Sequence, residues 1–144
     1  MWLEATDEER LMALFEDIIG QWTEEVEDSV KSILQTITFK IGSEVVRLSP
    51  VDTGRFKGNW QLTIDAPATS SLLRYDEAGG IVLGDMQRVV RTLTPGQVAY
   101  IQNTVEYGYD LEYGSSQQAP DGMVRITEAK FAILVNEAVR LHAN

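Results

Sequence analysis

The first third of the chain has apolar side chains spaced three and four residues apart. This spacing continues from Leu11 to Leu48 and places the apolar positions on one face of an α-helix. Thr6 and Glu9 have the spacing of a capping box, in which each side chain accepts a hydrogen bond from the other residue's backbone amide. Pro50 disfavours the helical conformation of the residue before it. The pattern therefore predicts one long helix over residues 7–48.

A helix of this length conflicts with the size of a compact domain. It would be about 60 Å long at 1.5 Å per residue, whereas a domain of 144 residues has a radius of gyration of about 15 Å. Either the helix bends, with Gly20 or residues 36–38 as candidate sites, or it projects and buries its apolar face on a neighbouring subunit. Because the stripe is so long relative to the domain, we expect oligomerisation.

The middle of the chain has the pattern of β-structure. Residues 60–64 alternate apolar and polar side chains, the period of a strand with one buried face. Further strands are expected at residues 72–75, 81–83, 89–93 and 98–105, with turns at Gly79-Gly80 and Pro95-Gly96. We predict a β-rich segment over residues 60–115 that forms an antiparallel sheet of about four strands.

A second helix is expected over residues 123–142, where apolar residues from Phe131 to Leu141 supply one side. Nothing in the composition separates two domains. The prediction is a single α+β domain over residues 1–144, with a long N-terminal helix, the sheet, and a C-terminal helix packed on the sheet.

The amino-acid composition excludes several kinds of catalytic and metal-binding site. The chain has no cysteine, which excludes disulfides, thiolate metal sites and a cysteine nucleophile, and its one histidine, His142, cannot form a multi-histidine metal site or a His-based triad. We expect no catalytic residue, no cofactor and no bound metal. No apolar run approaches the ~20 residues that span a bilayer, and the start of the chain lacks the pattern of a signal peptide, so no membrane association is expected.

The negative charge is concentrated at one end. The chain carries 12 basic and 22 acidic residues, a net charge of −10, and residues 1–30 hold ten of the acidic residues against Arg10 alone, which is −9. This balance argues against general binding to a phosphate backbone, which requires Lys and Arg to displace counterions.

Two segments have sequence motifs that are distinctive enough to indicate a structural or functional role. In residues 49–60, Ser-Pro-Val-Asp-Thr-Gly-Arg-Phe-Lys-Gly-Asn-Trp, a proline ends the helix and Gly54 permits a sharp corner into the following strand. In residues 106–125, two Glu-Tyr-Gly units precede a small-polar loop. From chemistry alone this second segment is an aromatic-lined turn, and its tyrosines would suit a protein interface.

Together these segments resemble a family of tailed-bacteriophage neck proteins, known as tail-completion, head–tail joining or minor tail component proteins. The resemblance rests on residues 49–56 with Asn59-Trp60, on Tyr100, on Leu-Glu-Tyr-Gly at 111–114 and on Ala-Pro-Asp-Gly-Met-Val-Arg at 119–125. It covers about residues 10–142, although residues 65–94 contain no motif that aligns.

The resemblance implies a structural virion protein. Such a protein forms a ring, expected to be a hexamer, between a portal–adaptor or head-completion protein and a tail terminator or tail tube protein. DNA passes through its channel without specific binding, and the protein is located in the virion after assembly in the host cytoplasm.

On this hypothesis the long helix packs against adjacent subunits, and the corner and the loop meet neighbouring rings. The expected interface residues are Pro50, Val51, Asp52, Thr53, Gly54, Arg55, Phe56, Trp60, Tyr107, Tyr109, Tyr113, Gly114, Met123 and Arg125.

Two alternatives remain open. The chain could be a small Mg²⁺-dependent enzyme acting on nucleic acid or nucleotides, with a site around Asp52, Arg55, Lys57 and Asp85. It could also be a cytoplasmic homo-oligomeric adaptor with no link to phages.

Overall fold

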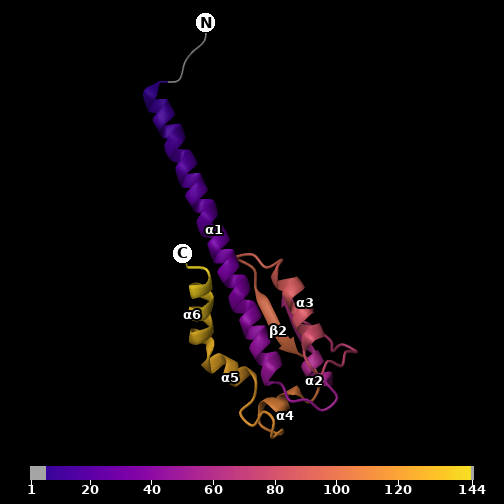
Figure 1. Ribbon diagram of the computed structural model, residues 1–144. Coiled ribbons are helices and arrows are strands. Elements are labelled where there is room, and N and C mark those ends of the chain that lie inside the picture. Colours follow the sequence, from indigo (N-terminus) through magenta and orange to yellow (C-terminus); the bar gives the residue numbers. More distant parts are fainter. Residues whose placement is uncertain (1–5, 144) are drawn as a thin grey trace.

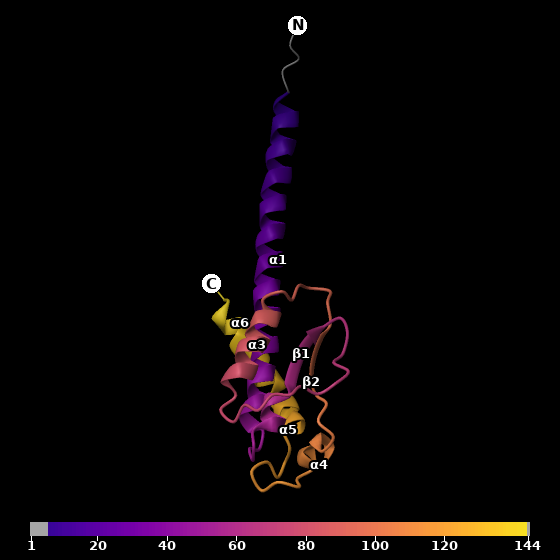
Figure 2. The same ribbon diagram turned by 90° about the vertical axis from the view of Figure 1, so that its right-hand side faces the viewer.

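The long N-terminal helix is present and uninterrupted. In the computed structural model, which describes residues 6–143, helix α1 runs over Asp7–Leu48. The capping box at its start is complete: the amide of Glu9 donates to Thr6 Oγ1 at 3.2 Å, and the amide of Thr6 donates to Glu9 Oε2 at 2.8 Å. Of the two solutions to the length conflict, the helix projects rather than bends (Figures 1 and 2).

The projection divides the molecule into an arm and a body. We call residues 7–30, the first part of α1, the arm, and residues 31–143 the body. Every residue of the arm is exposed, whereas α1 becomes partly buried from residue 31 and contributes Val45 and Val46 to the core. The arm extends ~36 Å at 1.5 Å per residue, and both views show it clear of the rest of the described chain (Figures 1 and 2).

The body consists of helices and a two-stranded sheet that pack around the second half of α1. Its other elements are α2 (Arg55–Gly58), β1 (Trp60–Ile64), α3 (Gly80–Val90), β2 (Ala99–Asn103), α4 (Gly108–Glu112), α5 (Val124–Ala129) and α6 (Phe131–Leu141). Strands β1 and β2 pair antiparallel with Leu62 opposite Ile101. Helix α3 packs against both α1 and β1, and α6 packs along another side of α1.

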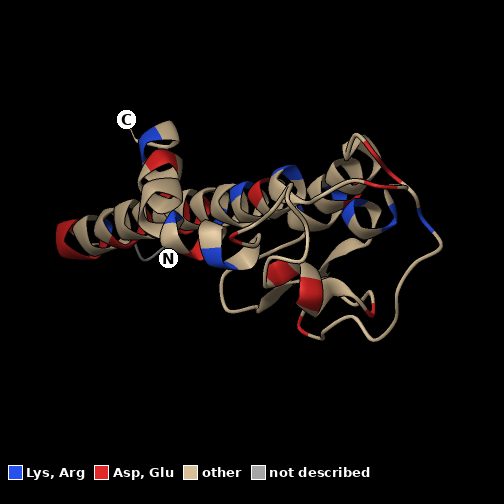
Figure 3. Cartoon of the chain, turned by 90° about the horizontal axis from the view of Figure 1, so that it is seen from below, with Lys and Arg blue, Asp and Glu red and all other residues tan. Residues whose placement is uncertain are grey.

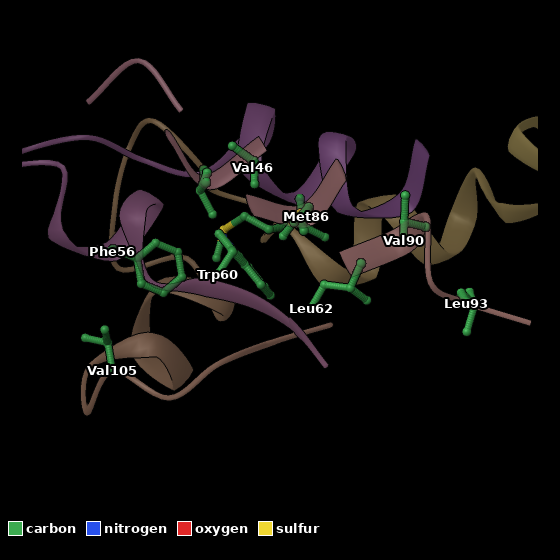
Figure 4. Packing of buried hydrophobic residues seen from close by; sticks show 12 residues of the cluster. Val46, Phe56, Trp60, Leu62, Met86, Val90, Leu93 and Val105 are labelled. Carbon is green, nitrogen blue, oxygen red and sulfur yellow. The ribbon is translucent and has the colours of Figure 1, made fainter. Parts of the chain in front are cut away.

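The core lies where α1, α3 and β1 meet. Met86 of α3 is 1% exposed and lies in the cluster with Val46 of α1 and with Trp60 and Leu62 of β1 (Figure 4). Gly42 permits the close approach of α3, because a Cβ atom at this position would lie 2.7 Å from Met86 Sδ. This packing fixes the second half of α1 to the other elements of the body. The arm therefore extends from a rigid base.

The prediction of four strands was wrong, because the described chain contains a sheet of two strands. Residues 60–64 and the region 98–105 form strands as expected, but residues 72–75 are irregular, and residues 81–83 and 89–93 belong to α3 and the turn after it. The buried residues of α3, Val82, Met86 and Val90, are four apart, the period of a helix. Short runs of β-branched residues in this segment favoured a strand prediction, and the four-residue spacing of the helix was not recognised.

Gly79-Gly80 was likewise expected to be a turn between strands, but it begins α3. Gly79 has φ 88° and is the N-cap, and the buried Asp76 carboxylate accepts hydrogen bonds from the amides of Gly79 and Val82 at 3.0 and 2.9 Å. Asp76 therefore satisfies amides that the first turn of the helix leaves unpaired.

The C-terminal helix is present but is divided at Lys130 into α5 and α6. It was expected to pack on the sheet, and instead α6 lies along α1 through Leu134 and Ala138. Lys130 Nζ donates to Glu44 Oε1 of α1 at 2.7 Å, which fixes the bend to the body.

Candidate interaction surfaces

The corner at residues 49–60 depends on one glycine. Gly54 has φ 85°, and a Cβ atom there would lie 2.6 Å from the backbone nitrogen of Glu77. The Gly54 carbonyl accepts hydrogen bonds from the amides of Gly58 and Asp76 at 2.8 and 3.0 Å. The Asp-Thr-Gly sequence therefore joins the end of α1 to the segment that precedes α3.

Trp60 anchors the corner to the helix that precedes it. Its Nε1 donates to Ser49 Oγ at 2.7 Å, and Ser49 Oγ donates to the Val45 carbonyl at 2.6 Å. Phe56 packs edge-on against Trp60 with ring centroids 5.8 Å apart. These contacts satisfy the polar atoms of a buried segment and hold its shape.

The loop at residues 106–125 is held by Glu112. Its carboxylate accepts hydrogen bonds from the amides of Met123, Val124 and Arg125 at 2.8–2.9 Å, which caps the start of α5. Burial opposes ionisation of Glu112, but these amides and the Arg125 guanidinium favour the carboxylate, and the net effect is a lowered pKa.

Two glycines permit this loop to close. Gly122 has φ 84°, and a Cβ atom there would lie 2.4 Å from the Glu112 carbonyl oxygen. Gly114 has φ 91°, and its Cβ would lie 2.7 Å from the carbonyl oxygen of Pro120. Arg125 also lies over the ring of Tyr113, 4.8 Å from its centroid. The Leu-Glu-Tyr-Gly and Gly-Met-Val-Arg sequences thus fold against each other.

The structure brings the corner and the loop together. Gln118 of the loop makes two hydrogen bonds with the backbone of Val51, at 2.9 and 3.0 Å. Arg55 forms a bidentate pair with Glu106 at 2.8 and 3.1 Å and lies 5.6 Å from the centroid of the Tyr107 ring. A cavity of about 460 Å³ lies between the two segments. They form one surface, the corner–loop end, which lies at the end of the body away from the arm (Figures 1 and 2).

The expected interface residues divide by exposure. Pro50, Gly54, Phe56, Trp60 and Met123 are buried within the body, and Val51, Arg55 and Tyr107 are partly buried. The exposed members are Asp52, Thr53, Tyr109, Tyr113, Gly114 and Arg125. Tyr109 is the most exposed aromatic side chain of this end at 74%, and its ring lies 4.6 Å from that of Tyr113. The buried members build the end, and the exposed members can contact a partner.

The arm carries more exposed large apolar side chains than any other element of the described chain. The long helix was expected to pack against adjacent subunits, although its residues were not among the interface residues named above. Nine large apolar side chains on it are between 42% and 66% exposed: Leu11, Met12, Leu14, Phe15, Ile18, Ile19, Trp22, Val26 and Val30. At roughly 100 Å² each they present on the order of 900 Å², above the 300–600 Å² of the largest patch on a typical monomer. Their helical spacing was the signal, and only the structure shows that the body leaves them uncovered.

The arm is also strongly acidic. Asp7, Glu8 and Glu9 lie in its first turn, where the helix dipole favours negative charge. The nine acidic residues and Arg10 of residues 7–30 sum to −8. Figure 3 shows acidic segments on the N-terminal end of α1, whereas acidic and basic segments are mixed on the body.

The residues of the alternative enzymatic site do not all come together. Asp52 and Arg55 line the cavity of the corner–loop end, whereas Asp85 lines a different cavity and pairs with Arg74 and Arg88. Among residues 6–143 there is no group of three or more His, Asp or Glu side chains placed to hold a metal ion. Within the same residues, no helix combines the length and apolar character required to cross a membrane.

Comparison of the sequence with known protein families and with curated proteins, and of the structure with solved structures, found no match.

Proposed function

We propose that the chain is a structural subunit of a tailed-bacteriophage particle, which forms a ring in the neck and joins the head to the tail. The observation that carries the proposal is the arm, a helix whose apolar face has no cover in the described chain. An exposed apolar surface of this size is typical of a protein–protein interface. A subunit that assembles with further copies of itself supplies that cover.

The arrangement of the two surfaces supports a ring. A ring between other components needs lateral contacts between its subunits and axial contacts with what lies above and below. The arm and the corner–loop end lie at opposite ends of the molecule (Figure 1), so one can serve the first kind of contact and the other the second. The resemblance in residues 49–60 and 111–125 supports the same assignment.

The partners follow from that position. The ring contacts a portal–adaptor or head-completion protein on one side and a tail terminator or tail tube protein on the other. The net charge of −10 suits a channel that DNA passes through without being bound, because acidic side chains repel the phosphate backbone. No catalytic step is assigned to the chain.

Two measurements test the proposal. Mass spectrometry of purified particles should detect the protein, and negative-stain microscopy of particles from a deletion strain should show heads and tails that have not joined. Restoring the strain with the wild-type gene, or with an Ala13→Asp gene as a control on the polar face of the arm, should restore joining. A protein that is strictly monomeric and absent from purified particles would overturn the proposal.

A further inference from the structure

A second apolar surface lies on the C-terminal helices. Eight of the eleven residues of α6 are apolar, yet Leu134 and Ala138 are its buried residues. A helix that is apolar on most sides is normally covered on most sides. Phe131 and Val139 are 51% and 44% exposed and share one flank of α6 with the partly buried Val135, because the three are spaced four residues apart.

This flank continues into a cavity. A space of about 250 Å³ is lined mainly by apolar side chains from α1, the sheet and α5–α6, among them Ile41, Trp60, Val124 and Phe131. Val124 is itself 49% exposed. The flank and the cavity form one apolar surface, which we call the α6 groove.

We propose that the arm of one copy docks in the α6 groove of the next copy, so that each subunit donates an arm and receives one. This inference rests on the proposed function for its ring but names the two surfaces that meet. Because the surfaces differ, the contact is heterologous, and repetition of a heterologous contact generates a ring when the rotation closes.

The shape of the arm favours a groove over a second arm. At 100° per residue, its nine apolar side chains cover about 160° of the helix circumference, wider than the narrow seam of a two-stranded coiled coil. Their exposed area of on the order of 900 Å² is comparable to the ~800 Å² that each partner buries in a stable interface. Pairing two arms would also leave the α6 groove uncovered.

Charge favours the same arrangement. Two arms side by side would bring together two helices that each carry −8 over residues 7–30. Residues 124–143 contain Arg125, Lys130 and Arg140 against Glu128 and Glu137, a sum of +1. Because Arg125 and Lys130 are paired with carboxylates of the loop and of α1, this surface is close to neutral. An arm on the α6 groove therefore avoids the repulsion that two paired arms would meet.

Two complementary variants test the contact. Ile18→Asp places a charge in the centre of the apolar face of the arm and leaves the α6 groove intact. Val139→Asp places a charge in the α6 groove and leaves the arm intact. Each should be monomeric alone, under conditions where the wild type associates. When mixed, the arm of the Val139→Asp chain should dock on the intact groove of the Ile18→Asp chain, giving a 1:1 complex of twice 16.1 kDa that cannot grow further.

Light scattering after size exclusion measures these masses. Ala13→Asp and Asn136→Asp, which add the same charge to other exposed faces of the same helices, are the matched controls and should associate as the wild type does. Circular dichroism should be unchanged in all four variants, since each position is exposed.

A disulfide trap gives an independent reading, because the chain has no cysteine of its own. Under mild oxidation, Ile18→Cys and Val139→Cys chains should cross-link when mixed and not when separate. Cross-linking of Ile18→Cys alone, or association that survives Val139→Asp, would show that arms pair with arms and would overturn the inference. Monomers in every sample, with no mixed cross-link, would overturn it as well.

Failure of the groove contact can be distinguished from failure of the proposed function. A protein found in joined particles whose association survives Val139→Asp keeps its neck role and loses the groove contact. A protein that forms the 1:1 complex but is absent from particles keeps the contact and loses the neck role.

Discussion

The two halves of α1 have the same kind of sequence and different surroundings. Both carry apolar residues at three- and four-residue steps, yet Val45 is 3% exposed and Val26 is 42% exposed. The body half meets α3, β1 and α6, and the arm meets nothing in the described chain. An amphipathic pattern thus predicts that a helix has an apolar face to bury. It does not show whether the same chain or a second molecule covers that face.

The largest effect should come from a charge placed on the apolar face of each half. Val45→Asp would bury an unpaired carboxylate in the core and should lower the free energy of unfolding by about 4 kcal/mol or more. Val26→Asp, on the exposed arm, should change it by less than ~0.5 kcal/mol at protein concentrations where the chain is monomeric. Urea unfolding followed by circular dichroism measures both, and equal losses would mean that the arm is part of the folded core.

Acid should act on the body half through Glu44. Its pKa is lowered from 4.5 to about 2, first because Arg47 donates to it and also because Lys130 does, while partial burial opposes the shift. A lowered pKa gives stability that is present above pH 4.5 and is lost as the pH falls toward 2. We expect a loss on the order of 2 kcal/mol across that range in the wild type.

The matched variant is Glu44→Gln, which should be less stable than the wild type at pH 7 and should lose less on acidification. Thermal unfolding at a series of pH values measures the difference. Parallel pH profiles for the two chains would contradict the role of Glu44 in holding α5–α6 to α1.

Glycine-to-alanine substitutions should change stability in opposite directions in the two halves of α1. A Cβ atom at Gly42 would lie 2.7 Å from Sδ of the buried Met86, so Gly42→Ala should cost about 1–2 kcal/mol of folding free energy. A Cβ atom at Gly20 meets nothing within 4 Å, so Gly20→Ala should strengthen the arm by about 1 kcal/mol. Hydrogen exchange resolves the two halves, and unchanged or increased protection of the body in Gly42→Ala would contradict the expectation for that half.

The smallest effect concerns the start of the arm. Thr6→Ala removes a side chain that accepts the Glu9 amide and should cost the first turn about 1 kcal/mol. Faster amide exchange over the first turn, with an unchanged unfolding midpoint for the body, is the expected result. Thr6→Ser retains the acceptor and should restore protection.

Local signals in the sequence predicted the elements whose causes are local. The capping box and Pro50 bound α1 correctly, and the alternation at residues 60–64 placed β1. The corner at Gly54 was also recognisable, because a positive φ selects glycine. In each case the interacting atoms lie within a few residues of one another.

The failures concern elements whose partners are distant in the sequence. Residues 81–93 contain short β-branched runs that suggest strands, and their helix is fixed by burial against α1 and β1. The role of Glu112 could not be predicted, because it caps a helix that begins twelve residues later. Trp60 and Met123 are buried by packing among segments far apart in the chain, so the sequence alone did not separate the buried from the exposed members of the expected interface residues.

The sequence by itself determined that residues 7–48 form one helix, that residues 1–30 of the chain carry most of the net charge, and that cysteine and multi-histidine chemistry are absent. Hydrogen bonds within a helix and side-chain composition need no distant partner. Only the tertiary structure decided that the body covers the second half of the helix and leaves the arm bare. That outcome depends on how many apolar faces the chain folds against one another, which is a property of the whole chain and not of any one segment.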